Sequence, residues 1–157
     1  MSGTVPKRQG AVKKRGPAAD AFSALVVQVF KLAAALETAG NALASPAGQS
    51  SARWQVLAAI EHEPMSVASI ARALAHTRQS VQRIADLLVA DGLAQYSPNP
   101  AHRRAKLLEL TPAGLAALQT IQAAQAHWAR HIAQGLQPAE LDAARELLTE
   151  LQHRLEQ

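Results

Sequence analysis

Residues 75–92, AHTRQSVQRIADLLVADG, have the pattern of one amphipathic helix, and this helix decides the fold. Its apolar residues recur at the spacing i, i+3, i+4 and i+7, which places them on one helix face. They are Val81, Ile84, Ala85 and Leu88. We expect Thr77 to be the N-cap, because its hydroxyl can accept a hydrogen bond from a free backbone N–H of the first turn. Gly92 follows the last apolar residues and favours an end to the helix there.

The opposite face of this helix carries Gln79, Gln82, Arg83 and Asp86. In the major groove of DNA, Gln can form two hydrogen bonds with adenine and Arg can form two with guanine. A face that only contacts water needs neither side chain, since Glu and Lys would serve. The pattern suggests a helix that contacts bases, with a plain amphipathic helix as the alternative.

A second amphipathic segment precedes this helix. Ser66 can cap it, and the apolar spacing repeats at Val67, Ile70, Ala71 and Leu74. Only about three residues, 75–77, separate the two segments. Two short helices joined by so tight a turn form a helix-turn-helix, whose second helix enters the major groove with its N-terminal residues first. This arrangement explains why Thr77, Arg78, Gln79 and Ser80 begin the helix, since free N–H groups at that end also favour phosphate.

The segments before the helix-turn-helix are also helical in pattern. We expect a long helix from Ala18 to about Leu43, followed by a loop over residues 45–51. Ser51 is expected to cap the next helix, and Pro64 is expected to end it.

After Gly92 the pattern changes. Residues 93–97 and 105–110 have the length of short strands, and residues 98–104 between them are rich in turn formers and then in charge. They predict a β-hairpin with a basic tip. Thr111 and Pro112 then begin a helix. After a break at 135–138, a last helix starts near Ala139 with leucines at heptad spacing.

Composition limits the classes of function. The 157 residues fit one domain, and the scarcity of aromatic residues favours helix over sheet. The chain has no cysteine, which excludes disulfides and cysteine metal ligands. A net charge of +4 favours an acidic partner such as nucleic acid. Because the apolar runs are short and interrupted by charges, we expect no membrane-spanning segment, and without a secretory signal we expect a cytoplasmic protein.

Residues 1–17 are basic and rich in Gly and Pro, with no helical or strand periodicity. We expect a disordered tail here. A solubilising end and a non-specific DNA-binding arm are both compatible with this composition.

From about Ala18 to its end, the chain resembles the MarR (multiple antibiotic resistance regulator) family of bacterial transcription factors. The matching stretches are SARWQVLAAI (51–60), SVASIARALAHTRQSVQRIADLLVADGLAQ (66–95) and NPAHRRAKLLELTPAGLAAL (99–118). The last is the most specific, because N-P-x-x-R-R-x-K followed by L-T-x-x-G is hard to produce by chance.

The resemblance implies a mainly α-helical fold, with a winged helix-turn-helix and a helical dimerisation region in each subunit. The DNA-binding lobe would span 51–111, and the dimerisation region would combine 18–45 with 112–157 in a single unit, 18–157. A homodimer would bind a palindromic operator, as a repressor that a small-molecule effector releases. An aromatic acid is the effector class that we consider.

The resemblance also implies which residues contact DNA. Those on the recognition helix are Arg78, Gln79, Ser80, Gln82 and Arg83, and those in the wing are Arg103 and Arg104. Phosphate contacts are expected at Ser51, Arg53, Ser66 and Lys106.

The chain departs from the family pattern at two places. His102 stands where the family wing usually has an acid that pairs with the second Arg, here Arg104. A neutral His offers one acceptor nitrogen and a protonated His offers none, so His102 would not fix Arg104 in the same way. We expect His102 to contact DNA phosphates near the wing tip, with an exposed side chain that contacts nothing as the alternative. The turn of the helix-turn-helix, which often carries Gly, is Ala75-His76.

The resemblance places an effector pocket near Gln28, Trp54 and Gln125. His127 and His131 have the i, i+4 spacing of a metal site, so a metal-sensing regulator is an alternative, although zinc needs three or four ligands. We expect no metal and no cofactor.

Two other classes of function remain as rivals. No nucleophile with a local base, no Gly-rich phosphate loop and no carboxylate pair with an evident role occurs, so we expect no enzyme. A sequence-tolerant architectural DNA-binding protein would fit the basic tail. Gln79 and Gln82 argue against it, because non-specific binding depends on charge and not on amide groups.

Overall fold

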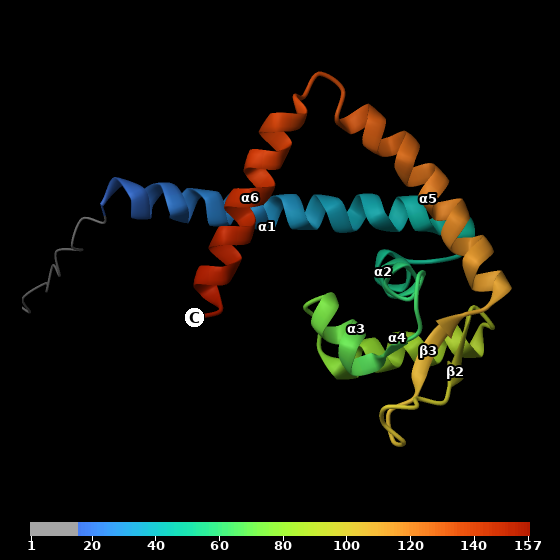
Figure 1. Cartoon of the computed structure of the whole chain (residues 1–157). Helices are drawn as coiled ribbons and strands as arrows, with labels where there is room; N and C mark the ends of the chain where they lie inside the picture. The colour runs from blue at the N-terminus through green and yellow to red at the C-terminus, as the bar shows by residue number, and fades with distance from the viewer. Residues whose placement is uncertain (1–15) are drawn as a thin grey trace, which may run out of the picture. The chain divides into compact units, whose positions relative to one another are not determined.

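The computed structural model describes residues 16–157, which are mainly helical with a small antiparallel sheet (Figure 1). The helices are α1 (Pro17–Ala44), α2 (Ser51–Ala59), α3 (Val67–Ala73), α4 (Arg78–Ala90), α5 (Pro112–Ile132) and α6 (Pro138–Leu155), with a 3-10 helix η1 (Ser45–Ala47). The strands are β1 (Met65–Ser66), β2 (Ala94–Ser97) and β3 (Leu107–Leu110). Residues 1–15 of the predicted basic tail lie outside the described residues. Its last residue, Pro17, is the first residue of α1.

Contacts divide the chain into one unit that ends at Ala39 and a second unit, Gly40–Gln157. The first unit contains most of α1. The second contains the helix-turn-helix, the sheet, α5 and α6. The predicted division into a lobe over 51–111 and a helical dimerisation region stays a prediction.

The core of the second unit lies between α2, α3, α4 and the sheet, and Leu118 of α5 also joins it. All four residues of the predicted apolar stripe on α4 are buried in this core. Thr77 caps α4 by accepting from the Ser80 backbone N–H at 3.2 Å, and Ser66 caps α3 by accepting from Ser69 N–H at 3.2 Å. The helix-turn-helix is therefore confirmed together with both of its N-caps.

The turn between α3 and α4 depends on one residue in the left-handed region. Ala75 has a φ of 53°, and the next N–H, that of His76, donates to the Ala71 carbonyl at 2.9 Å. This conformation costs a residue with a Cβ more than it costs glycine. The turn therefore tolerates alanine at position 75, although the backbone conformation of this residue favours glycine.

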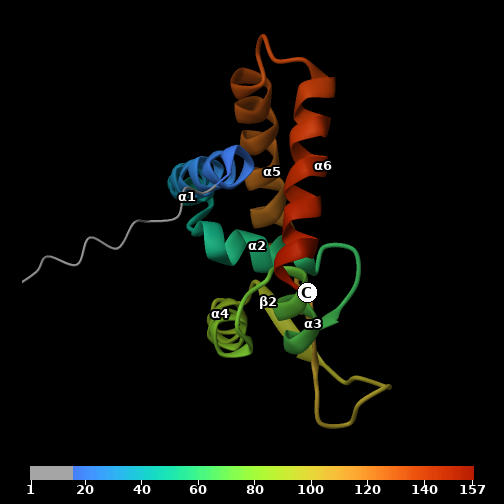
Figure 2. The same cartoon turned by 90° about the vertical axis from the view of Figure 1, so that its left-hand side faces the viewer.

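The sheet has the strand order β1-β3-β2, with both pairings antiparallel. β2 and β3 form the predicted hairpin, which we call the wing (residues 94–110), and Figure 2 shows its loop projecting from the second unit. β1 was not predicted, because a strand of two residues is too short to show a periodicity.

The L-T-x-x-G motif joins the wing to α5. Thr111 caps α5 through Gly114 N–H at 3.1 Å, and its own hydroxyl donates to the Gly92 carbonyl at 2.6 Å. A Cβ at Gly114 would lie 1.8 Å from the carbonyl oxygen of Leu93. The motif therefore has a structural role, since it fixes where the wing meets α5.

Both predicted ends of α2 were wrong. Ser50 is the N-cap, accepting from Arg53 N–H at 3.3 Å, and Ser51 is the first helical residue. Two adjacent serines are equivalent as caps, but Ser51 is buried where a Cβ on Gly40 would lie 2.7 Å from its hydroxyl oxygen. The helix ends at Ala59 and not at Pro64, because the chain must extend to form β1 at Met65.

The expectation that no segment could cross a membrane was also wrong, in the limited sense of length and composition. Residues 17–47 form a helical stretch of 31 residues that contains an 18-residue window with a mean hydropathy of 1.6, so it is long and apolar enough for a span on those two criteria alone. Its charged residues, Asp20, Lys31 and Glu37, are too widely spaced to interrupt the apolar run.

Candidate nucleic-acid interface

A groove lies where the start of α4, the start of α3 and the wing meet, and we call it the α4 groove. Six residues that the sequence analysis assigned to DNA contacts line it: Ser66, Arg78, Gln79, Gln82, Arg104 and Lys106. The structure therefore brings together side chains that lie up to 40 positions apart in the chain.

Strand pairing and capping explain this convergence. β1 pairs with β3 so that Ser66 lies opposite Leu107, the neighbour of Lys106. The Thr77 cap makes Arg78 and Gln79 the first two residues of α4, so both lie at the helix end whose free N–H groups favour anions. The α4 groove thus combines amide groups, cations and a helix N-terminus.

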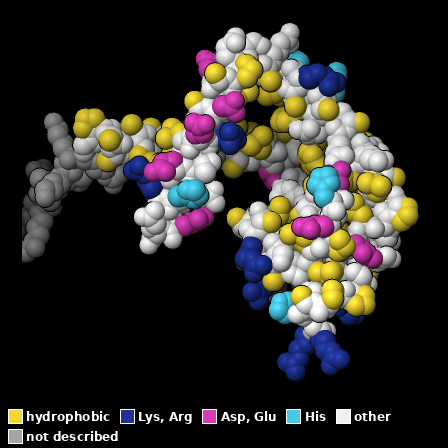
Figure 3. Space-filling view, in the orientation of Figure 1, with side chains coloured by type: hydrophobic (Ala, Val, Ile, Leu, Met, Phe, Trp, Pro, Cys, Tyr) yellow, Lys and Arg dark blue, Asp and Glu magenta, His cyan; other side chains and the backbone are white. Residues whose placement is uncertain are grey.

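The cations of this surface are not engaged by acids of the same chain. Within residues 16–157, Arg78, Arg103, Arg104 and Lys106 form no ion pair, and all four are exposed. Figure 3 shows Lys and Arg side chains protruding at the end of the wing. These positive charges are free to contact phosphates.

The wing tip is held by turn hydrogen bonds, and no pairing between an acid and an Arg contributes. His102 N–H donates to the Asn99 carbonyl at 3.3 Å, and the Asn99 side chain accepts from Ala101 N–H at 3.0 Å. His102 itself is exposed. Asn99 therefore orders the tip of this wing through its side chain and its backbone carbonyl.

Three further predicted residues lie on α4 or at its cap but do not line the groove. The Thr77 hydroxyl is occupied by capping, and Ser80 is partly buried. Arg83 is exposed on the polar face of α4, and within residues 16–157 it has no ion-pair partner.

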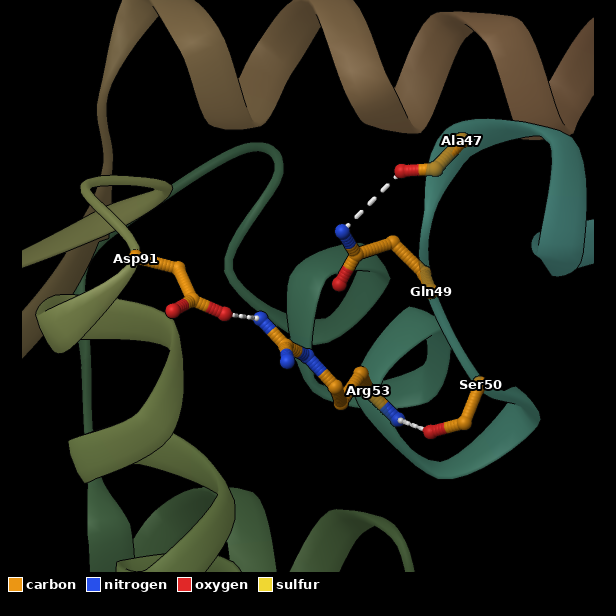
Figure 4. Close-up of polar contacts among 5 residues, drawn as sticks. All are labelled: Ala47, Gln49, Ser50, Arg53 and Asp91. Carbon is orange, nitrogen blue, oxygen red and sulfur yellow. Dashed lines mark hydrogen bonds and ion pairs between the residues drawn. The ribbon is translucent and has the colours of Figure 1, made fainter.

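Two predicted phosphate contacts have other roles in the structure. Ser51 is 4% exposed, and its hydroxyl accepts from the Gln55 amide at 3.3 Å. Arg53 forms an ion pair with Asp91, which is drawn in Figure 4. The two atoms are 2.5 Å apart, and the Arg53 side chain is 18% exposed. Neither side chain lines the α4 groove, and their predicted phosphate contacts stay predictions.

The Arg53 ion pair connects α2 to the C-terminal end of α4, where Asp91 is the C-cap. Arg53 Nε and Gln49 Oε1 are buried and have no hydrogen-bond partner within residues 16–157. The Gln49 amide donates to the Ala47 carbonyl at 3.1 Å, a contact drawn in Figure 4. Asp91 is the sole acidic partner of Arg53 among the described residues, so the orientation of its guanidinium depends on this one carboxylate.

Gln82, Asp86 and Tyr96 form a hydrogen-bonded cluster that was not predicted, in which each pair of side chains is 2.8 Å apart. Tyr96 comes from β2 and lines the α4 groove. Burial, with a further contribution from Asp86, raises the pKa of Tyr96 to about 12. The sequence places Asp86 on the polar face of the helix. Its contact with Tyr96 could not be predicted, because the two residues are 10 positions apart and belong to different elements.

The predicted effector residues do not share one described site. Trp54 is partly buried against the core, Gln125 is partly buried on α5, and Gln28 is exposed in the first unit. A different hollow in the second unit is lined by Leu43, Ala124, His127, Trp128 and His131.

The two histidines of this hollow, His127 and His131, were the candidates for a metal site. Within residues 16–157 no group of three His, Asp or Glu side chains is placed to hold a metal ion. The i, i+4 pair on α5 therefore lacks a third protein ligand in the described chain.

Comparisons with known proteins place these features in a family. Residues 48–105 match the sequence model of the MarR family. An uncharacterized protein of Mycobacterium tuberculosis is 40% identical over 129 residues, which cover 82% of this chain and 90% of that protein.

Two solved structures illustrate the similarity of fold. Mutant MarR of Escherichia coli in complex with operator DNA has a TM-score of 0.73 at 22% identity, covering 81% of this chain and 92% of that one. CouR of Rhodococcus jostii bound to p-coumaroyl-CoA has a TM-score of 0.72 at 16% identity, covering 81% and 90%. Both are winged-helix regulators, as the predicted fold class requires.

Proposed function

Because the chain belongs to the MarR family of transcription regulators, which are non-enzymatic DNA-binding proteins, we propose that it is a homodimeric repressor of a palindromic operator. The α4 groove carries this proposal. It presents Gln79 and Gln82 for base edges and Arg104 and Lys106 for phosphates, around the exposed N-terminus of α4. Arg83 adds a third base contact on α4, and Arg103 and His102 extend the phosphate surface to the tip of the wing.

Sequencing the DNA that the purified protein selects from a random pool tests this function. We expect a palindrome whose half-sites lie about one helical turn apart, because a two-fold dimer presents two recognition helices at that spacing. Selection without any preferred sequence would instead support a sequence-tolerant architectural protein. The Arg83→Ala variant should still select a palindrome but relax one symmetric pair of positions.

The homodimer is supported by apolar side chains that nothing in the described chain covers. On α1, Phe30 is 71% exposed, and every residue of α6 is exposed except the partly buried Leu151. Soluble monomers rarely leave long apolar stripes in contact with water. A second copy of the chain would cover these helices and, through C2 symmetry, place two α4 helices on one face.

Release by an effector requires a ligand that binds two spacings of the recognition helices with different affinity. We place the effector in the hollow beside Trp128, with an aromatic acid as its class. The apolar walls would accept a ring, and His127 or His131 could face a carboxylate. That CouR was solved with p-coumaroyl-CoA bound is consistent with an aromatic acyl ligand here.

Tryptophan fluorescence with p-coumarate as the probe tests this placement, because the chain has two tryptophans. Quenching should persist in Trp54→Phe and disappear in Trp128→Phe. Loss of quenching in Trp54→Phe alone would move the pocket to Trp54, and no quenching in the wild type would exclude this ligand.

The repressor would act in the bacterial cytoplasm, where its operator is accessible.

A further inference from the structure

The cluster of Gln82, Asp86 and Tyr96 lies in the wall of the α4 groove, and each of its hydrogen bonds has a fixed direction. An ionised carboxylate can only accept, so Asp86 Oδ1 accepts from both the Tyr96 hydroxyl and Gln82 Nε2, each at 2.8 Å. The single hydroxyl proton of Tyr96 is therefore used. The phenol oxygen is left to accept the second N–H of Gln82, at 2.8 Å.

Both amide hydrogens of Gln82 are consequently used in hydrogen bonds to side chains of the same chain. Its carbonyl oxygen Oε1 has no hydrogen-bond partner within residues 16–157, and the side chain is exposed at the α4 groove. Gln82 therefore presents an acceptor to the groove and no donor.

This arrangement changes what Gln82 can recognise. A two-pronged contact with adenine needs an acceptor for the N6 amino group and a donor for N7. An acceptor alone can pair with an exocyclic amino group, which the major groove displays at adenine N6 and cytosine N4. Guanine and thymine offer acceptors at the corresponding positions, so they would leave Oε1 facing another acceptor.

We propose that Tyr96 and Asp86 turn Gln82 into an acceptor-only base contact that selects adenine or cytosine at one symmetric pair of operator positions. Gln82 is the residue that touches the base. Tyr96 and Asp86 are positioning residues, which act by occupying its amide hydrogens. The proposal rests on the proposed function, since it needs an operator whose bases the protein distinguishes.

The experiment uses the operator selected from a random pool by the full chain. Selection with Gln82→Ala first identifies the symmetric pair of positions that this residue specifies. At an adenine there, 7-deazaadenine should change the wild-type affinity less than twofold, because nothing donates to N7. Purine without the N6 amino group should weaken binding by about fivefold per half-site, the effect of removing one hydrogen bond. At a cytosine, removal of the N4 amino group should have the same effect.

The Tyr96→Phe variant supplies a readout that a purely structural role would not change. Loss of the phenol oxygen frees one N–H of Gln82, so this variant should become sensitive to 7-deazaadenine or should shift its preference from cytosine towards adenine. Gln95→Ala is the matched control, because it removes another 2.8 Å side-chain hydrogen bond of β2, that to Glu109. The control should keep the wild-type base preference, and circular dichroism checks that both variants are folded.

Several outcomes would overturn the proposal. They are guanine or thymine at the Gln82 position, a loss of affinity with 7-deazaadenine equal to that without the amino group, or unchanged preferences in both Gln82→Ala and Tyr96→Phe. In each of these cases the protein still selects a sequence, so the proposed function stands. A pool that yields no preferred sequence contradicts the proposed function itself, and the base contact with it.

Discussion

Asp86 lies on α4, and Asp91, five residues later, is the C-cap of the same helix. Each of the two carboxylates binds a side chain from another element. Asp86 accepts from Tyr96 of β2, and Asp91 pairs with Arg53 of α2. Neither contact could be predicted from the sequence, because the partners are 10 and 38 positions away and no periodicity links them. The same contacts hold Arg53 between α2 and the end of α4, and they occupy the amide hydrogens of Gln82 at the α4 groove.

The pKa of Tyr96 offers a direct test of the cluster, since Tyr96 is the only tyrosine in the chain. Ultraviolet absorbance of tyrosinate should show a midpoint near pH 12 in the folded protein and near the ordinary value of about 10 in urea. Because the folded pKa is the higher one, the stability contribution of this group is complete below about pH 10 and disappears as the pH rises through 12. A midpoint near 10 while circular dichroism still shows a folded chain would contradict the cluster.

Replacing Asp91 by Asn tests the ion pair with Arg53. The change should lower the free energy of unfolding by about 1–2 kcal/mol, because the largely buried guanidinium loses its acidic partner. Glu150→Gln is the matched control, because the side chains of Glu150 and Asp91 are both 53% exposed. Their arginine partners differ: Arg154 is 70% exposed, whereas Arg53 is 18% exposed. We expect less than about 0.5 kcal/mol for the control in urea unfolding. Equal destabilisation in the two variants would show that burial of Arg53 adds nothing.

At the scale of elements, the sequence predicted what local chemistry determines. The buried stripe of α4 and the caps Ser66, Thr77 and Thr111 follow from spacing and hydroxyl side chains, and the structure has all of them. Ser51 was the wrong cap for α2, because the choice between two serines depends on packing against Gly40, which is distant in the chain. β1 was missed for the same reason, since pairing with β3 and not local propensity makes it a strand.

The wing provides the prediction at this scale. Arg103→Ala and Arg104→Ala should each weaken binding to all DNA sequences. They should also flatten the plot of log affinity against log salt, by about one unit for each phosphate that each subunit no longer neutralises. Arg130→Ala is the matched control, because it removes an exposed α5 cation that is not part of the wing or the groove. A slope that stays the same in a wing variant would show that its arginine does not bind phosphate.

At the scale of the whole molecule, the chain is described as two units, and the prediction at this scale concerns the proposed dimer. Sedimentation should give a mass of twice 16.6 kDa. Leu148→Glu and Leu155→Glu, which place charges on the exposed leucines of α6, should shift the protein towards monomer. Thr149→Glu adds the same charge to a polar position of α6 and should leave the dimer intact. A wild-type monomer, or recovery of the protein with membranes through α1, would contradict this assembly.

The central claim is that the α4 groove recognises a particular DNA sequence. Its most direct test is the ratio of two affinities, for the selected operator and for a scrambled duplex of equal length at the same salt concentration. We predict a ratio of at least about 10³ for the wild type. The double variant Gln79→Ala, Arg83→Ala should give a much smaller ratio. Its affinity for the scrambled duplex should fall only slightly. A wild-type ratio near one would contradict the account.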